Sequence, residues 1–482
     1  MNLLEPLRVF LQARSERAYL VGGALRDVLL ERETHDLDVS VQGSASNIAR
    51  AFADDLGAAY FLMDAEHDVA RVILERADGT RDIVDFARLR GGSVQDDLAT
   101  RDFTINAMAA DAASWDGQAD ALIDPFNGRQ DLEAKRVRAV RAEVFRNDAV
   151  RLLRAARMEA ELGFVLDEET ARLVRRDAEL LAFAPMERAR DELVKVIAAP
   201  NALRNLRRLD ALRLLGHILP EVNAMRGVTQ SSPHIYDVFE HSLHAVNAAE
   251  ETERAGYSNL AQGAFGEQLR EHFAQRLSAE RTRRELLRLT LLLHDIGKPA
   301  TRTVEANGRI RFFGHEDVGA AMVESAFRRL KFSNDEIVRA KTIVQHHLRP
   351  LLLAQNGITT RAVYRFFRDT GDVGVDIAVH AWCDQNATYG ADDVSDEKVA
   401  LQAVIGRLLE RYYHAREEVI APPPLLNGND VIEFLQVPPG PRVGEMLDAV
   451  REAQAVGEVT TREEAFAFLR AWGKGKKFDP PA

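Results

Sequence analysis

Two aspartates in the segment DLDVSV have a spacing that could support chemistry. Asp36 and Asp38 are two positions apart, so in a β-strand their side chains would project from the same face. Two carboxylates on one face repel each other unless a divalent cation lies between them, and magnesium prefers such oxygen ligands together with substrate phosphates. Such a pair alone is usually a solvated strand edge, but beside a phosphate-binding turn it predicts phosphoryl or nucleotidyl transfer.

A glycine pair that precedes these aspartates could form that turn. Gly22 and Gly23 follow the apolar residues LV and begin a helical run. Glycine allows close approach of the backbone to an anion, and a helix N-terminus favours negative charge. Asp85, in IVDFA, is expected on a neighbouring strand. It would be either a third catalytic carboxylate, which binds metal or takes the proton from the attacking hydroxyl, or a plain surface aspartate.

The elements that must position these residues follow from the pattern of apolar side chains. Residues 20–43 predict a strand, a helix and a second strand, and residues 44–56 predict a helix begun by a serine. The segments YFLMD, DVARVILER and RDIVDFA alternate well enough to extend a small sheet. We therefore expect an α/β arrangement at the start of the chain.

Length and composition limit the class of protein. The chain of 482 residues is long enough for about three domains, and its hydrophobic fraction of 46% and charged fraction of 29% are typical of soluble globular proteins. No apolar run approaches the ~20 residues that span a bilayer, and the N-terminus lacks the features of a signal peptide, so we expect a cytoplasmic protein without a membrane partner.

The one cysteine of the chain, Cys383, excludes internal disulfides and cysteine-based zinc clusters. The net charge of −12 argues against indiscriminate coating of nucleic acid but not against a local basic groove.

A charged face is predicted on the helix that begins near residue 148. Asp148, Arg151 and Arg154 would lie together, opposite an apolar stripe of Ala149, Leu152, Leu153, Ala156 and Ala160. Taken alone, Asp148 and Arg151 would form a surface ion pair that contributes roughly a few tenths of a kcal/mol.

Five motifs that follow one another along the N-terminal part of the chain allow a more specific interpretation. GGALRDVLL, DLD, TRDFTINAMA, DPFNGRQDL and RNDAVRLLRAARMEAELGF together resemble the class II tRNA nucleotidyltransferase and bacterial poly(A) polymerase family. The resemblance implies a multidomain fold that begins with an α/β, polymerase-β-like catalytic head and continues with an all-α neck. It also implies two Mg²⁺ ions at Asp36 and Asp38, and addition of nucleotides to an RNA 3′ end without a nucleic-acid template. The nucleotide-binding residues that we expect are Gly22, Gly23, Arg26, Arg101, Asp102, Asn106, Asp148, Arg151, Arg154 and Arg157.

The same resemblance gives Asp148 and Arg151 the role of a template base. The carboxylate would accept from the exocyclic amine that CTP and ATP share, the guanidinium would donate to ring acceptors, and UTP and GTP would be excluded. The sequence departs from the usual family pattern at Thr100, where an arginine is common, and at Asn147, where an acidic residue is common. The 3′ end and acceptor stem of tRNA are expected on a cluster of arginines: Arg136, Arg138, Arg141, Arg146, Arg154 and Arg157.

A second constellation of histidine and aspartate lies in the C-terminal half. His241, His294, Asp295, His315, the QHH of 345–347 and Asp384 reproduce the ordered pattern of HD-domain phosphohydrolases, which they resemble. Imidazole and carboxylate ligands suit a divalent transition metal such as Mn, Ni, Co or Zn, and the metal would activate water against a phosphoester, with Lys298 near the phosphate. A single buried histidine would more often be a hydrogen-bonded core residue, but the ordered set favours a metal site.

These observations predict four domains. We expect a catalytic head at 1–145, a helical neck with the nucleotide-selecting helix at 146–230, an HD domain at 231–420 and, after three prolines, a helical tail at 421–482.

One short segment bears on nucleotide specificity. Between Asp85 and Asp97 lies FARLRGGSVQD, whereas full CCA-adding members of the family usually carry a longer loop there. The first hypothesis is therefore a CC-adding enzyme that uses CTP, followed by a full CCA-adding enzyme that also uses ATP, and then by an A-adding enzyme or poly(A) polymerase. A hypothesis of another class is an HD-domain nucleotide phosphohydrolase whose N-terminal half binds RNA, and a non-enzymatic RNA-binding module is the last. The chain would act as a monomer or a homodimer.

Overall fold

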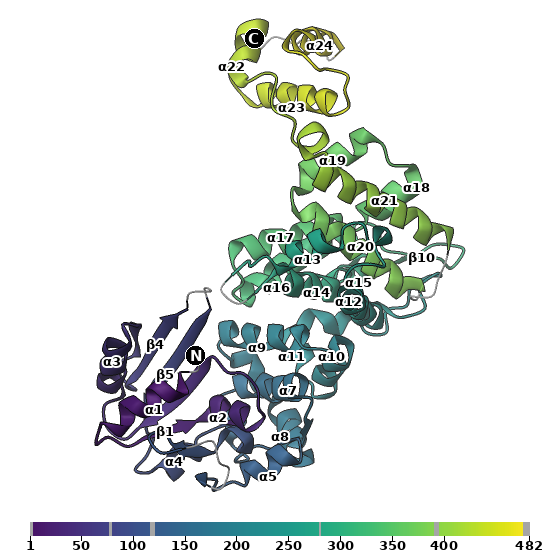
Figure 1. The fold of residues 1–482 in the computed structure, drawn as a ribbon. Helices are drawn as coiled ribbons and strands as arrows, with labels where there is room; N and C mark the ends of the chain where they lie inside the picture. The colour runs from purple at the N-terminus through teal and green to yellow at the C-terminus, as the bar shows by residue number, and fades with distance from the viewer. Residues whose placement is uncertain (1–2, 77–79, 116–120, 279–280, 390–394, 476–482) are drawn as a thin grey trace. The chain divides into compact units, whose positions relative to one another are not determined.

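The computed structural model describes residues 3–76, 80–115, 121–278, 281–389 and 395–475. The chain divides into two compact units (Figure 1). One unit comprises Met1–Ala199 and Arg207–Ile218, and the other comprises Pro200–Leu206 and Leu219–Ala482. The multidomain fold that the sequence predicts, with an α/β N-terminal part and a helical remainder, is confirmed, whereas the finer division into four domains stays a prediction.

A six-stranded sheet forms the framework of the first unit, in the order β3-β4-β5-β2-β1-β6. Its strands are β1 (Ala18–Val21), β2 (Asp36–Val41), β3 (Ala59–Asp64), β4 (Val69–Glu75), β5 (Arg81–Arg88) and β6 (Ala109–Asp111). β2 pairs with β5 in parallel, and the other neighbouring strands pair in antiparallel fashion. The strands predicted from alternating apolar residues are therefore present, and the parallel pair places the DLD segment beside the strand that contains Asp85.

One face of this sheet is covered by α1 (Leu4–Gln12) and α3 (Ala45–Leu56). Three phenylalanine rings form a row between these helices and the sheet. Phe10 of α1 lies 5.0 Å from Phe52 of α3, and Phe52 lies 5.8 Å from Phe86 of β5, measured between ring centroids. Ser44 caps α3 by accepting a hydrogen bond from the Asn47 N–H, as its position in the sequence predicts. Because side chains alternate along a strand, residues next to Phe86 point to the opposite face of the sheet, away from these helices. This opposite face carries the acidic residues.

Helices make up most of the rest of the first unit. They are α2 (Gly22–Leu29), α4 (Val94–Leu98), α5 (Gly128–Glu133), α6 (Val144–Asn147), α7 (Val150–Leu162), α8 (Glu168–Asp177), α9 (Met186–Ala198) and α11 (Leu215–Ile218), with α10 (Ala202–Ala211) at the division between the units. A short parallel pair joins β7 (Arg136–Val137) to β8 (Val165–Leu166). In α7, Leu152, Leu153 and Ala156 are buried as the apolar stripe predicts, and α7 packs against α9.

The second unit is almost entirely helical. It contains α12 (Val238–Arg254), α13 (Gly266–Ala274), α14 (Arg283–Leu293), α15 (Lys298–Thr301), α16 (His315–Arg329), α17 (Asn334–His346), α18 (Arg349–Asn356), α19 (Thr360–Thr370), α20 (Val373–Tyr389) and α21 (Asp396–His414), with a small pair of strands, β9 (Thr303–Val304) and β10 (Ile310–Arg311). α12, α14 and α20 pack against one another. α20 is buried on nearly all sides and contains the buried Cys383, so little of this helix is open to solvent.

The last three helices have an apolar core of their own. α22 (Gly428–Leu435), α23 (Pro441–Ala455) and α24 (Arg462–Gly475) bury Val431, Met446 and Leu469 against one another. The helical tail that the sequence predicts after the proline run is thus present. Among the described residues, the helices are too short or too polar to span a bilayer.

Candidate active site

Three carboxylates lie on the open face of the sheet. In the parallel register of β2 and β5, Asp38 lies directly opposite Asp85, and Asp36 is two residues before Asp38 on the same face. Burial raises the pKa of Asp38 above its ordinary value against the opposing effect of Arg101, and the charges of Asp85 and Asp36 raise it further. A divalent cation would relieve this repulsion, and an oxygen donor set of this kind fits a hard ion.

An arginine that the sequence analysis did not single out balances part of this charge. Arg71 lies opposite Asp85 in the antiparallel pair of β4 and β5. Its Nε and one terminal nitrogen donate to the two Asp85 oxygens at 2.7 and 2.8 Å. Asp85 is therefore a member of the acidic cluster and not an isolated surface residue.

The predicted glycine turn lies directly beneath Asp38. Gly22 begins α2 with a φ of +74°, a left-handed conformation that favours glycine. A Cβ at this position would lie 2.7 Å from Asp38 Oδ2 and 2.9 Å from a terminal nitrogen of Arg101. The Gly23 N–H donates to the Asp38 carboxylate. The turn thus holds the Asp38 carboxylate in place, a role that adds to the phosphate contact expected of it.

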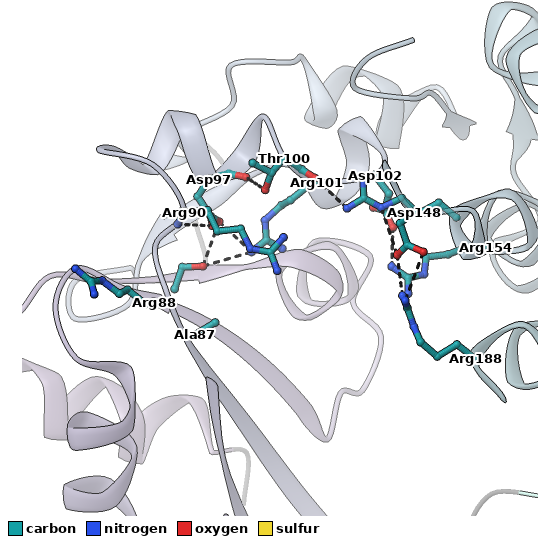
Figure 2. Close-up of a pocket in the computed structure, with 12 residues that line it drawn as sticks. Ala87, Arg88, Arg90, Asp97, Thr100, Arg101, Asp102, Asp148, Arg154 and Arg188 are labelled. Carbon is teal, nitrogen blue, oxygen red and sulfur yellow. Dashed lines mark hydrogen bonds and ion pairs between the residues drawn. The ribbon is translucent and has the colours of Figure 1, made fainter. Parts of the chain in front are cut away.

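A cavity of about 410 Å³ opens on the same face of the sheet (Figure 2). Because residues predicted to bind a nucleotide line it, we call it the nucleotide pocket. Its volume is in the range of small-ligand sites. Its floor includes Ser40 and Ala87, which follow Asp38 and Asp85 along their strands. Its other lining residues are Arg88, Arg90, Asp97, Thr100, Arg101, Asp102, Asp148, Arg151, Arg154 and Arg188. Five of the predicted nucleotide-binding residues are thus brought together: Arg101, Asp102, Asp148, Arg151 and Arg154.

Asp148 makes its closest ion pair with a residue that the sequence analysis missed. Arg188, in α9, donates to the two Asp148 oxygens at 2.7 and 3.4 Å, whereas Arg151 Nε lies 4.0 Å away. Arg151 instead donates to the Thr100 carbonyl at 3.0 Å. Although burial opposes it, the hydrogen bond from Arg188 holds the pKa of Asp148 below its usual value. Asp148 is therefore a charged acceptor at the wall of the nucleotide pocket.

Three predicted nucleotide-binding residues lie behind the pocket wall. Arg26 is 8% exposed and donates to Asn106 Oδ1 at 2.9 Å. Asn106 donates in turn to Asp102 at 3.1 Å, and Asp102 accepts from Arg154 at 2.9 Å. Arg157 pairs with Glu192 of α9 at 3.1 Å. Asn106 thus contacts a lining residue directly, and Arg26 reaches that residue only through Asn106. Arg157 reaches the lining residue Arg154 only through Glu192, and none of these three predicted residues lines the pocket itself.

The histidines and aspartates of the second unit converge as the sequence predicts. Their side chains form two groups, within each of which the potential ligand atoms lie within 4.8 Å of one another: His241, His294 and Asp384, and Asp295, His315 and His347. His294, His315 and His347 each direct Nδ1 to the carbonyl oxygen three residues earlier, at 2.8, 2.8 and 2.6 Å. These hydrogen bonds leave Nε2 of each ring directed to the centre, which is the arrangement that metal-binding histidines require. The donor set therefore fits a divalent transition metal.

His380 also belongs to this cluster and was not predicted. It is fully buried, and its ring centroid lies 5.1 Å from that of His294 and 5.8 Å from that of His347. Among the described residues, neither of its nitrogens has a hydrogen-bond partner, and burial holds its pKa well below the usual value. Its position four residues before Asp384, on one face of a helix, could have indicated it.

A cavity of about 520 Å³ adjoins this cluster of histidines and aspartates and contains Lys298. Lys298 Nζ lies 2.7 Å from Asp295 Oδ2 and donates to Gln230 Oε1 at 2.7 Å. The cavity wall also includes His234 and the rings of Phe312 and Phe313. The cavity thus combines a lysine side chain with aromatic surface.

Comparison with known proteins accounts for nearly the whole chain. Family models match as follows: the poly A polymerase head domain at residues 18–138, the probable RNA and SrmB-binding site of polymerase A at 163–226, the HD domain at 238–369 and a putative tRNA nucleotidyltransferase domain 2 at 316–469. The chain is 34% identical to the A-adding tRNA nucleotidyltransferase of Deinococcus radiodurans over 463 residues, which cover 95% of this chain and 96% of that protein. It is 31% identical to the CC-adding tRNA nucleotidyltransferase of Thermus thermophilus over 466 residues, which cover 95% and 94%. The solved CCA-adding enzyme of Bacillus stearothermophilus in complex with CTP has a similar fold, with a TM-score of 0.63, 24% identity and coverage of 98% of each chain.

Proposed function

Because the chain belongs to the tRNA nucleotidyltransferase family, we propose that it adds CMP residues to the 3′ end of immature tRNA, with CTP as the nucleotide and two Mg²⁺ ions at the acidic site. The reaction needs no nucleic-acid template, and it takes place in the cytoplasm, where tRNA is the partner. The observation that carries the choice of CMP is the short connection between β5 and α4.

This connection, residues 89–93, is fixed at several points. The Leu89 N–H donates to the Val41 carbonyl at 3.0 Å, and the Arg90 N–H donates to Asp97 at 3.1 Å. The Gly92 N–H donates to Asp96 at 3.2 Å, and Ser93 caps α4. A segment this short and this well hydrogen-bonded has little freedom to reshape the nucleotide pocket between two bases of different size. It therefore argues against a full CCA-adding enzyme, and a loop this short resembles that of the CC-adding members of the family.

We infer that Asp148 and Arg151 select the base of the incoming nucleotide. The charged Asp148 carboxylate, held by Arg188, accepts from the exocyclic amine of cytosine, and Arg151 donates to the ring acceptors. Uracil has a carbonyl oxygen where cytosine has the amine, so two acceptors would face each other and UTP is disfavoured. At the next ring position uracil has an N–H donor where cytosine has the acceptor that Arg151 meets, so a second mismatch, of two donors, excludes UTP. Replacing Arg151 by Ala removes this second mismatch and should allow UTP to compete.

The remaining residues bind and orient the triphosphate. Asp36 and Asp38, with Asp85 beside them, would hold the ions, which supply neutralising charge at the phosphates and lower the pKa of the attacking 3′-hydroxyl. Arg101 lies against Asp38 and offers a fork of donors to a phosphate, and Arg88 and Arg90 add positive charge at the rim. Asp38, Asp85 and Arg101 are held by hydrogen bonds or ion pairs before the substrate enters, which reduces the reorganisation that the reaction requires.

The decisive experiment supplies each labelled nucleotide separately to tRNA transcripts that end at the discriminator base, at C and at CC. The proposal predicts two CMP additions to the first transcript, one to the second and none to the third, with no AMP added to any. AMP addition to the CC transcript alone would instead identify an A-adding enzyme, a candidate that the identity of 34% to the Deinococcus protein favours. Addition of CMP and then AMP would identify a full CCA-adding enzyme. The Asp38→Asn variant is the control, because it should add no nucleotide to any transcript.

A second activity is proposed for the cluster of the other unit. The converging Nε2 atoms of His294, His315 and His347 support a transition-metal site that hydrolyses a phosphoester. The adjoining cavity places Lys298 where it can bind the phosphate. The chain would then be bifunctional.

A further inference from the structure

A second cavity adjoins the nucleotide pocket and has no role in the function proposed above. It has a volume of about 640 Å³ and shares five lining residues with the nucleotide pocket: Arg90, Thr100, Asp148, Arg151 and Arg188. Its other walls are Arg146, Asn147, Ala149, Leu180, Phe183, Ala184 and Pro185. A group bound in the second cavity would therefore be next to a nucleotide bound in the first.

One aromatic ring in this second cavity is unusually open to solvent. Phe183 is 85% exposed, the largest fraction among the exposed large apolar side chains of the described residues. It ends the 3-10 helix η3 (Ala178–Phe183), in which residues three apart share a face. Ala178, Leu181 and the following Ala184 are buried, so Leu180 and Phe183 fall together on the outer face. The fold thus presents this ring to the cavity instead of to the core.

Arginines accompany the ring. The side chains of Arg146 and Arg188 are 58% and 50% exposed, and each makes an ion pair with an aspartate, Asp177 and Asp148 respectively. A guanidinium has five N–H donors, so each retains donors for a further anion. An exposed aromatic ring among cations is typical of sites that bind single-stranded nucleic acid, where a base stacks on the ring and phosphates bind the cations.

We propose that this second cavity binds the 3′-terminal nucleotide of the tRNA, with its base stacked on Phe183 and its phosphate bound by Arg146 and Arg188. Stacking tolerates any base, because every base has a π face. This tolerance suits an acceptor whose last base changes after each addition. The inference rests on the proposed function in one respect, since it assumes that RNA is the acceptor.

The test measures binding of a tRNA that carries 2-aminopurine at its 3′ terminus, without nucleotide, to the full-length protein. Stacking quenches the fluorescence of this base. Phe183→Ala should abolish the quenching and weaken tRNA binding about tenfold, or ~1.4 kcal/mol. It should leave the KM for CTP within about twofold of the wild-type value. Phe183→Trp should restore both quenching and affinity, and Phe61→Ala, at a 49% exposed ring on β3, should behave as wild type.

Two results would overturn the inference: normal quenching with Phe183→Ala, or a loss of quenching that Phe183→Trp does not restore. The quenching measurement does not depend on which nucleotide is added. If the wild type adds AMP in place of CMP, the proposed function fails while the stacking test keeps its meaning. If the wild type adds CMP and Phe183→Ala quenches normally, the stacking site alone is refuted.

Discussion

Replacement of Gly22 by alanine should separate the geometry of the acidic site from the stability of the fold. The new Cβ would lie 2.7 Å from Asp38 Oδ2, where ordinary contacts begin at 3.4 Å, so the carboxylate must retreat by about 0.7 Å. A misplacement of about 1 Å at a reacting centre can lower the rate by about a hundredfold. We therefore expect the rate of nucleotide addition by Gly22→Ala to fall by about two orders of magnitude.

The same substitution also strains the backbone, and a second glycine controls for that effect. Gly57 has a φ of +62°, close to the +74° of Gly22, but a Cβ there would meet no atom within 4 Å. An alanine in this left-handed region costs about 1–2 kcal/mol at either position. Gly57→Ala should therefore lower thermal stability to a similar extent while it retains wild-type activity.

The assay measures nucleotide addition at saturating tRNA and CTP, together with thermal unfolding by circular dichroism. Equal activities of Gly22→Ala and Gly57→Ala would refute the reasoning, because the close approach to Asp38 would then have no consequence. The reasoning would also fail if the activity of Gly22→Ala fell only in proportion to the folded fraction.

Two further predictions concern charges at the two sites. Arg188→Ala removes the ion pair to Asp148. Because such partly exposed pairs contribute up to about 1 kcal/mol, we expect the KM for CTP to rise by up to about fivefold. An unchanged KM would show that Arg188 does not orient Asp148. The double variant His294→Ala with Asp295→Ala should lose its bound transition metal, measured by mass spectrometry, and should no longer hydrolyse a model phosphodiester. It should retain nucleotide addition. Loss of both activities would contradict the model of two independent sites.

The acidic site was largely predictable, because its residues follow local rules. The period of a strand places Asp36 and Asp38 on one face, and the structure adds the parallel register that places Asp85 beside Asp38. The second cluster was predicted on a different ground, since its ordered histidines and aspartates resemble the pattern of HD-domain phosphohydrolases. What local rules provide is the direction of a side chain relative to its own helix or strand.

Residues that act through long-range contacts were not predictable. Arg188 reaches Asp148 across 40 positions of sequence, and no periodicity links them. Arg26 belongs to a recognised motif, yet the fold buries it against Asn106, 80 positions away, so its guanidinium supports the pocket from behind. No sequence pattern predicted that the ring of Phe183 would be exposed, because its exposure depends on which face of η3 packs inward.

The parallel pairing of β2 and β5 also limits how this protein can change in length. Phe86 and Asp85 are neighbours that face opposite sides of the sheet, one in the row of rings with Phe52 and the other beside Asp38. Insertion or deletion of one residue within β5 would exchange these sides, which would bring an aromatic ring to the acids and bury a carboxylate among the rings. Substitutions at the rim of the pocket can accumulate one at a time, but this strand can gain or lose residues only in ways that keep its register.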